Sequence, residues 1–326
     1  MSVHAYFGGK SSKAFREFIN VQIPSEGITT YVEPFSGAMG TYMDDPDLNF
    51  DNVYYNDKNR HQVNLMKCCA NPEEFLPYLY QLKETTLYTE STDVFEKWDF
   101  YKAIYKDWVA SDFLDNMNFE IGDYGVAARY AFLITSAHNS VYPRGGGFNG
   151  YKKPNDRLKL EVLINKLEKD KYGDKLRSIN EYTNIDFEEL IKKHDSENTF
   201  FYLDPPYARF NEEKGIDDAR RLFWYGSDDE NTFGPASHRR LLELIKASKG
   251  RWALSYYYFP LLEELLPKDE YRWIDKEFNR SSAHGGNNAN LKAKQSKGRE
   301  LLIMNYDETG KRYNRHDIRV ADSQEG

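Results

Sequence analysis

The chain has 326 residues, of which 40% are hydrophobic, so it is long and apolar enough to build one large core with an inserted unit. It contains no apolar run that could span a bilayer and no signal peptide, and its only cysteines, Cys68 and Cys69, are adjacent, which disfavours a structural disulfide and offers no metal-ligand spacing. We therefore expect a soluble cytoplasmic protein without a metal, and the net charge of −8 means that a nucleic acid would have to be bound through local basic patches.

The first motif lies near the N-terminus, where Phe7 and Gly8 are followed by Gly9 and Lys10. Paired glycines let the backbone approach a ligand closely, and a lysine adds a positive charge. A plain turn is the simpler explanation of so short a motif. Residues 12–19 are predicted to form a short amphipathic helix.

A strand is predicted at residues 29–35, and a glycine-containing turn that begins at Ser36 and Gly37 leads from it into a helix. A strand, a glycine turn and a helix form the first unit of many nucleotide-binding sheets. The Gly-x-Gly-x-x-Gly fingerprint is absent, which disfavours a fold that binds a dinucleotide pyrophosphate.

The second predicted strand, residues 53–57, ends in an acidic residue, Asp57. A carboxylate at the tip of the second strand of such a sheet is placed to hold ribose hydroxyls. It could equally cap the N-terminus of the helix predicted at residues 59–70.

The alternation of strands and helices is lost between residues 71 and 175. Helices are predicted at residues 94–110, 124–138 and 160–167, and the aromatic stripe of the first favours a place in the core. The intervening segment, residues 137–154, is rich in glycine, aromatic and basic residues. This composition is typical of a hairpin or loop that enters DNA, although a solvated linker would look similar. The candidate DNA contacts in it are Asn139, Tyr142, Arg144, Phe148, Asn149, Lys152 and Lys153.

The sheet pattern resumes at about residue 176, and Asp186 and Phe187 open a helix after a short strand. The long polar loop at residues 208–229 is typical of a lid or a disordered segment. Residues 279–298 carry cations that suit phosphates, and the chain from about residue 307 is expected to be a polar tail. The predicted strands here are residues 179–182, 252–258, 271–277 and 299–305, and the predicted helices are residues 238–248 and 261–266.

Residues 199–203 are predicted to be a buried central strand, and Asp204 follows them directly. Pro205 and Pro206 cannot donate to a strand ladder, so the sheet ends there. Asp204 is therefore expected at the carboxyl end of a strand, where open α/β sheets bind ligands. With the Pro205 carbonyl it forms an edge of hydrogen-bond acceptors that suits an exocyclic amine such as adenine N6, and Tyr207 can stack on a base. A strand that merely ends in a proline-rich turn is the alternative.

Taken together, these motifs resemble the Dam-type (D12 class) family of S-adenosylmethionine-dependent DNA N6-adenine methyltransferases. The resemblance runs from Phe7 to about Tyr306, and the order of the motifs makes it specific. The motifs are Gly8-Gly9-Lys10, Glu33-Pro34-Phe35-Ser36-Gly37, Asn56-Asp57-Lys58-Asn59, the segment from Tyr142 to Asn149, Asp186-Phe187, Asp204-Pro205-Pro206-Tyr207, Arg280-Ser281-Ser282 and Glu300-Leu301-Leu302.

The resemblance implies a Rossmann-like α/β methyltransferase fold, with a mostly parallel twisted sheet, helices on both faces and an inserted, mainly helical target-recognition domain. Residues 1–70 and 176–309 would form the catalytic domain, residues 71–175 the insertion and residues 310–326 the tail. The implied setting is a prokaryotic or phage-infected cell. The implied partners are double-stranded DNA and a cognate restriction endonuclease, with the enzyme acting as a monomer or weak dimer.

The resemblance also implies roles for individual residues. Lys10 would contact the methionine carboxylate of the cofactor, Asp57 its ribose, and Asp186 with Phe187 its adenine. The residues implied in S-adenosylmethionine binding are Phe7, Gly8, Lys10, Glu33, Pro34, Phe35, Ser36, Gly37, Asp57, Asp186, Phe187 and Asp204. Those implied in catalysis are Asp204, Pro205, Pro206 and Tyr207, and Arg280, Ser281 and Ser282 join the candidate DNA contacts.

One residue departs from the family pattern: Met39 stands where relatives usually carry a second glycine, which leaves a close backbone approach to the cofactor open there. Cytosine-N4, RNA and protein-glutamine methyltransferases could use a similar tetrapeptide at the end of the central strand. The N-terminal Gly-Gly-Lys motif and the large insertion argue against the latter two. A catalytically silent DNA-binding relative is the alternative from another class, and the presence of Lys10, Asp57 and Asp204 argues against it.

Overall fold

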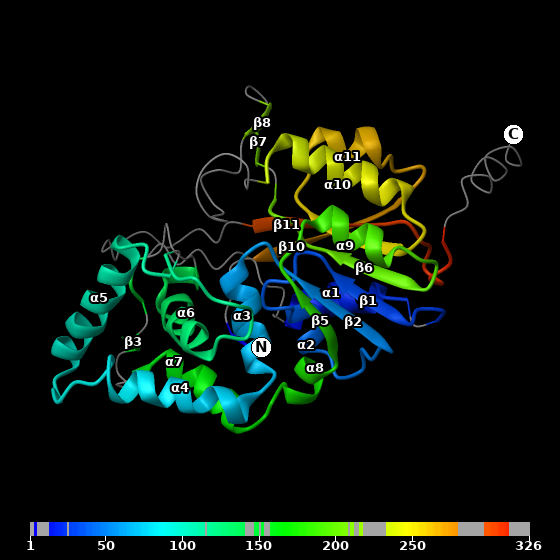
Figure 1. Cartoon of the computed structure of the whole chain (residues 1–326). Helices are drawn as coiled ribbons and strands as arrows, with labels where there is room; N and C mark the ends of the chain where they lie inside the picture. The colour runs from blue at the N-terminus through cyan, green and yellow to red at the C-terminus, as the bar shows by residue number, and fades with distance from the viewer. Residues whose placement is uncertain are drawn as a thin grey trace, which may run out of the picture.

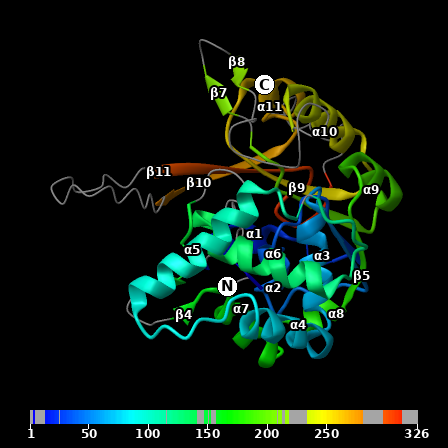
Figure 2. The same ribbon diagram turned by 60° about the vertical axis from the view of Figure 1, so that its left-hand side comes forward.

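The protein is described by a computed structural model, whose overall arrangement is drawn in Figures 1 and 2. The described residues are 3–4, 13–24, 26–114, 116–140, 147–149, 151–152, 157–207, 209–211, 215–217, 233–279 and 297–312.

A seven-stranded sheet forms the centre of the molecule, in the order β10-β11-β9-β6-β1-β2-β5. The five strands from β9 to β5 pair in parallel, and β11 runs antiparallel to both of its neighbours. This mixed, mostly parallel sheet surrounded by helices confirms the predicted fold class. The strands are β1 (Thr30–Glu33), β2 (Asn52–Asn56), β5 (Ile179–Thr183), β6 (Thr199–Leu203), β9 (Arg251–Tyr256), β10 (Arg272–Asn279) and β11 (Lys297–Met304).

The central strands are apolar on both faces because both faces are covered, as expected for a parallel sheet. Every residue of β6 is buried. Phe200 and Tyr202 contribute to one hydrophobic cluster, while Phe201 and Leu203 contribute to a second one on the opposite face. The alternation follows from the two-residue period of a strand.

Helices cover the two faces unequally (Figure 1). The smaller cluster is closed by three amphipathic helices, α9 (Phe187–His194), α10 (Pro235–Ala247) and α11 (Pro260–Leu265). The larger cluster takes in the remaining helices. These are α1 (Lys13–Ile19), α2 (Gly40–Met43), α3 (Arg60–Cys69), α4 (Pro72–Glu84), α5 (Val94–Ala110), α6 (Tyr124–Ser136), α7 (Leu160–Glu168) and α8 (Gly173–Arg177).

The segment between residues 71 and 175 is mainly helical, as predicted. Its helix α6 is buried on almost all sides. It packs against α3, which contacts β5 of the sheet, and also against α4 and α7. A single hydrophobic cluster therefore joins the insertion to the sheet. The only strands described in this segment, β3 (Tyr151–Lys152) and β4 (Arg157–Leu158), pair as a short hairpin. Within the residues described, β7 (Arg209–Asn211) and β8 (Gly215–Asp217) form a second such pair.

Helix α4 is absent from the predicted elements. Its exposed interior residue, Pro77, disfavours a helix because it removes a backbone donor. Burial of Phe75, Leu79 and Leu82 against the rest of the larger cluster outweighs that cost.

The described residues include 310–312, the first three residues of the predicted C-terminal tail. Tyr306 pairs with Arg312 through an isolated β-bridge, and a guanidinium nitrogen of Arg312 donates to the Lys249 carbonyl over 2.8 Å. Residues 310–312, which were assigned to the tail, thus pack beside the start of β9. Among the described helices, none is long and apolar enough to cross a membrane.

Gly250 provides a test of the packing at the amino end of β6. A Cβ atom at this position would lie 2.8 Å from Phe201 Cε2 and 3.0 Å from the Thr199 carbonyl oxygen. Because this strand is fully buried and cannot retreat, we expect Gly250→Ala to lower the free energy of unfolding by about 1–3 kcal/mol in urea titrations. Gly147→Ala is the control, since no atom lies within 4 Å of its added Cβ. Equal stabilities of the two variants would contradict this packing.

Candidate active site

The candidate site lies where the sheet changes direction. From β1 the chain order proceeds to β2 and β5 on one side, and to β6 and β9 on the other. The carboxyl ends of the two strands at such a switch point diverge and leave a crevice in which open α/β sheets bind ligands. The turn after β1 and the tetrapeptide after β6 both lie at the carboxyl ends of these two strands, where such a crevice is expected.

The tetrapeptide after β6 is folded back onto the neighbouring strand. The Tyr207 hydroxyl donates to Asp204 Oδ1 over 2.8 Å, and it also contacts Glu300. The Tyr207 ring stacks on Tyr256, with centroids 5.2 Å apart and an interplanar angle of 23°, and meets Tyr257 edge-on. Tyr207 is therefore held by both its ring and its hydroxyl, and this hydroxyl forms a charge-assisted hydrogen bond with Asp204.

A second tyrosine supports the proline pair. The Tyr256 hydroxyl donates to the Pro206 carbonyl over 3.3 Å and forms a further hydrogen bond with His238 Nδ1. Burial of His238, which is 1% exposed, lowers its pKa to about 4, so the ring is neutral at physiological pH. Pro205 and Pro206 are themselves buried. The backbone of the tetrapeptide is thus fixed from β9 and α10.

Backbone and side-chain hydrogen bonds make the turn after β1 rigid. Gly37 adopts a φ of +49°, which glycine tolerates without strain. Its N–H donates to Asp57 Oδ2 over 2.8 Å, and its carbonyl accepts from Tyr55 and from Gln62. Ser36 donates its hydroxyl to the Glu33 carbonyl over 2.6 Å. This turn is consequently held in one conformation in the structure.

Met39, the departure from the family pattern, also lies in this turn. It is fully buried and has left-handed backbone angles, with φ 49° and ψ 41°. Such a conformation costs a residue with a Cβ about 1–2 kcal/mol, a cost that glycine avoids. The packing of the Met39 side chain in the larger hydrophobic cluster accompanies this strained backbone.

Glu33, the last residue of β1, is 3% exposed and accepts a hydrogen bond from the Tyr31 hydroxyl. Burial raises the pKa of Glu33 to about 8, although the Tyr31 hydrogen bond opposes the shift; the nearby Asp204 carboxylate raises it further. The carboxyl groups that end β1 and β6 therefore share one electrostatic environment. An adjacent cation would favour the ionised form of Glu33, so this side chain is suited to lie beside a positively charged group.

Asp57 has a structural partner for each carboxylate oxygen. Oδ2 accepts from Gly37 N, and Oδ1 accepts from Asn59 N over 2.7 Å. The cap of α3 is Asn59, whose side chain accepts from His61 N and Gln62 N, so the alternative of Asp57 as that helix cap is wrong. Burial raises the Asp57 pKa to about 6, and the two backbone hydrogen bonds oppose the shift. Each carboxylate oxygen retains a second lone pair for a hydroxyl.

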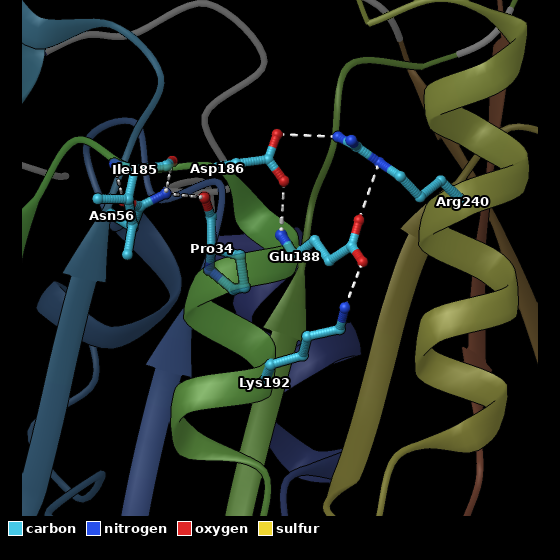
Figure 3. A network of polar contacts seen from close by, with 7 residues as sticks. All are labelled: Pro34, Asn56, Ile185, Asp186, Glu188, Lys192 and Arg240. Carbon is cyan, nitrogen blue, oxygen red and sulfur yellow. Dashed lines mark hydrogen bonds and ion pairs between the residues drawn. The ribbon is translucent and has the colours of Figure 1, made fainter.

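Asp186 and Phe187 begin α9, as predicted, and Figure 3 shows the polar network around them. Asp186 caps the helix by accepting from Glu188 N over 2.9 Å, and its other oxygen forms an ion pair with Arg240 of α10 at 2.8 Å. The Arg240 guanidinium lies over the Phe187 ring, 4.6 Å from its centroid. Phe187 also packs against Phe35, with centroids 5.5 Å apart, which joins the loops after β1 and β5.

Asn56 is a site residue without a predicted role. Its side-chain nitrogen donates to the carbonyls of Pro34, at 3.0 Å, and Ile185, at 3.2 Å, while its oxygen accepts from Ile185 N (Figure 3). The same oxygen also accepts from the Thr183 hydroxyl. One buried amide thus connects the loops after three adjacent strands. The sequence signal was its place beside Asp57 at a strand end, but its partners lie 22 and 129 residues away.

The structure describes only some of the predicted DNA contacts, and one of them is buried. Phe148 is 8% exposed and packs against Trp98 and Tyr105, so its ring belongs to the core and the expectation that it enters a base stack is not supported. The Asn149 side chain lies 3.5 Å from His138 Nδ1. Asn139 lies in a short 3-10 helix (His138–Ser140) and Lys152 lies in β3. The side chains of these two residues are not among those that the structure describes. The remaining predicted site residues lie outside the described part of the chain. They are Phe7, Gly8, Lys10, Tyr142, Arg144, Lys153, Arg280, Ser281 and Ser282.

The comparison with known families decides the assignment. The model of the D12 class N6 adenine-specific DNA methyltransferases matches residues 6–281. The chain belongs to this family. The match spans the turn after β1, Asp57, Asp186 and the tetrapeptide after β6. No curated protein is found to match the chain.

The pKa of Glu33 predicts how stability depends on pH. A buried carboxyl group whose folded-state pKa is about 8, against an ordinary pKa of 4.5 in water, stabilises the fold fully below pH 4.5 and loses this contribution as the pH rises through 8. We expect Glu33→Gln to be as stable as the wild type at pH 5 and more stable by on the order of 2 kcal/mol at pH 8. Urea titrations at both pH values test this, with Glu90→Gln on an exposed loop as the control. Equal stability of Glu33→Gln and wild type at pH 8 would contradict it.

Proposed function

We propose that this D12 class enzyme transfers the methyl group of S-adenosylmethionine to N6 of an adenine that is flipped out of double-stranded DNA. The observation that carries the proposal is the position of Asp204, at the end of the central strand and beside the carboxyl end of β1. Its carboxylate and the Pro205 carbonyl would accept the two N6 hydrogens. Acceptors on both hydrogens favour the pyramidal amine and the positive charge that develops as it is methylated.

The crevice has the donors and acceptors that the cofactor requires. S-adenosylmethionine supplies an activated methyl group on a cationic sulfur. The buried carboxyl group of Glu33 suits that positive charge, and the unused lone pairs of Asp57 suit ribose hydroxyls. The rings of Phe35 and Phe187 offer apolar contact for an adenine, with Asp186 as an acceptor for its amine. Phe7, Gly8 and Lys10, together with Pro34, Ser36 and Gly37, would complete the site. The described residues contain no cluster that could hold a metal ion.

The tetrapeptide supports the target base in two ways. Pro206 is held by Tyr256, which fixes the backbone that carries the Pro205 carbonyl. Tyr207 is stacked on the same tyrosine and would contribute contact to the base from a fixed position, which offsets part of the few kcal/mol that extrusion costs. Alignment of the amine with the methyl group then provides most of the acceleration.

DNA would be bound by the inserted segment, residues 71–175, which we propose as the target-recognition unit. Arg144, Lys152 and Lys153 would contact phosphates and base edges, with Asn139, Tyr142 and Asn149 as neighbours. Arg280, Ser281 and Ser282 would contact the DNA backbone as well. Specific recognition needs both kinds of contact, since phosphates position the protein and base edges carry the sequence.

Substitution of Asp204 tests the catalytic proposal. We expect Asp204→Asn to slow single-turnover methyl transfer at least about 100-fold, because a neutral amide cannot stabilise the charge that develops on N6. The rate is measured with radiolabelled methyl, and mass spectrometry of the digested DNA identifies the product base. Cofactor affinity should remain within about threefold. Asp269→Asn, an exposed substitution, is the control. Wild-type turnover by Asp204→Asn, or N4-methylcytosine as the product, would refute the proposal.

Substitution of Asp186 tests the cofactor proposal separately. Asparagine is as good a helix cap as aspartate, so Asp186→Asn preserves the start of α9 while it removes the charge. We expect the affinity for S-adenosylmethionine, measured by calorimetry, to fall about 5- to 30-fold. Lys192→Ala, at the far end of the network in Figure 3, should bind as the wild type does. Unchanged affinity in Asp186→Asn would place the cofactor adenine elsewhere.

A further inference from the structure

Glu300 is a buried carboxyl group that the roles above do not use. It lies on β11, on the same face as Leu302 and Met304, which are both 0% exposed, and it is itself 3% exposed. A carboxyl group at a core position of a strand lowers the stability of the fold unless hydrogen bonds compensate for its lost hydration. Glu300 also lies beyond residues 6–281, the span matched by the family model.

Glu300 Oε1 forms a hydrogen bond with the Tyr207 hydroxyl. The same hydroxyl lies 2.8 Å from Asp204 Oδ1. A hydroxyl carries one proton, which Tyr207 must share between Asp204 and Glu300. The strength of its hydrogen bond to Asp204 therefore depends on its contact with Glu300. The environment keeps that proton on Tyr207, because burial and the two neighbouring carboxyl groups raise its pKa well above the ordinary value.

The Tyr207 ring is fixed by the strand next to Glu300. Leu301 of β11 is paired with Tyr256 of β9, and Tyr256 is the ring on which Tyr207 stacks. The two adjacent strands therefore hold Tyr207 at two points, the ring from β9 and the hydroxyl from β11. With both points fixed, the hydroxyl oxygen lies between the carboxyl groups of Glu300 and Asp204.

We propose that Glu300 is a positioning residue for methyl transfer, which holds the Tyr207 hydroxyl against Asp204 and acts on the target amine only through Tyr207. This inference rests on the proposed role of Asp204. The proposal gives a side chain on β11 a role in the reaction, although β11 is not paired with β6 in the sheet.

A double-mutant cycle tests the proposal on the full-length enzyme. The variants are Glu300→Ala, Tyr207→Phe and the double variant, and the measurement is the single-turnover rate of methyl transfer to adenine. Tyr207→Phe keeps the stacked ring and removes only the hydroxyl. We expect each single variant to be about 10- to 100-fold slower than the wild type, and the double variant to be no slower than the slower single variant. Losses that multiply in the double variant would overturn the proposal, and so would a wild-type rate in Glu300→Ala.

Two further variants separate positioning from folding and from charge. Glu300→Gln has the same shape and can still hydrogen-bond the Tyr207 hydroxyl, so it should recover most of the rate, and a rate as low as that of Glu300→Ala would overturn the proposal. All variants should bind S-adenosylmethionine within about threefold of the wild type by calorimetry, and weaker binding in Glu300→Ala would instead assign Glu300 to the cofactor site. Glu181→Gln, on the edge strand β5, is the matched control and should be unaffected.

The same assay distinguishes this proposal from the proposed function. If the wild type does not methylate adenine, or if Asp204→Asn retains its rate, the proposed function fails. If both of those results are as expected and Glu300→Ala transfers methyl at the wild-type rate, only the role of Glu300 fails.

Discussion

The candidate active site depends on the burial of carboxyl groups at one edge of the sheet. Glu33, Asp57 and Glu300 are each no more than 3% exposed, and each is held by a hydroxyl or by backbone N–H groups. Removal from water makes such groups costly to ionise, which the raised pKa values of Glu33 and Asp57 record. These buried carboxyl groups therefore lower the stability of the fold at the place where a cation and ribose hydroxyls would bind, a trade-off that is common in enzymes.

Much of this architecture could be predicted because its signals are local. The apolar run of β6 followed by two prolines places Asp204 at a strand end, and the aromatic spacing of α5 predicts its bounds from Val94 to Ala110. These features depend on the period of the pattern and on residues that end an element. The order of the motifs, rather than any one of them, made the family recognisable before the fold was known.

The parts that could not be predicted depend on contacts between distant segments. Asn56 looks like an ordinary strand-end amide until Pro34 and Ile185 are brought to it, and Glu300 looks like a strand carboxylate until Tyr207 reaches it. Phe148 shows the reverse case. Its glycine-rich, basic surroundings suggested exposure, but Trp98 and Tyr105 bury its ring. Composition describes a segment, whereas the role of a residue is decided by what the fold places beside it.

The continuous packing of α6 against α3 has a consequence for how the recognition role proposed for residues 71–175 could diverge. Because the helices of residues 71–175 share their interior with the sheet layer, exchanging that whole segment with one from a relative would expose or overfill the joint along α3. Under that proposal, new specificities would arise most readily by point changes within the segment. The crevice geometry would be inherited unchanged.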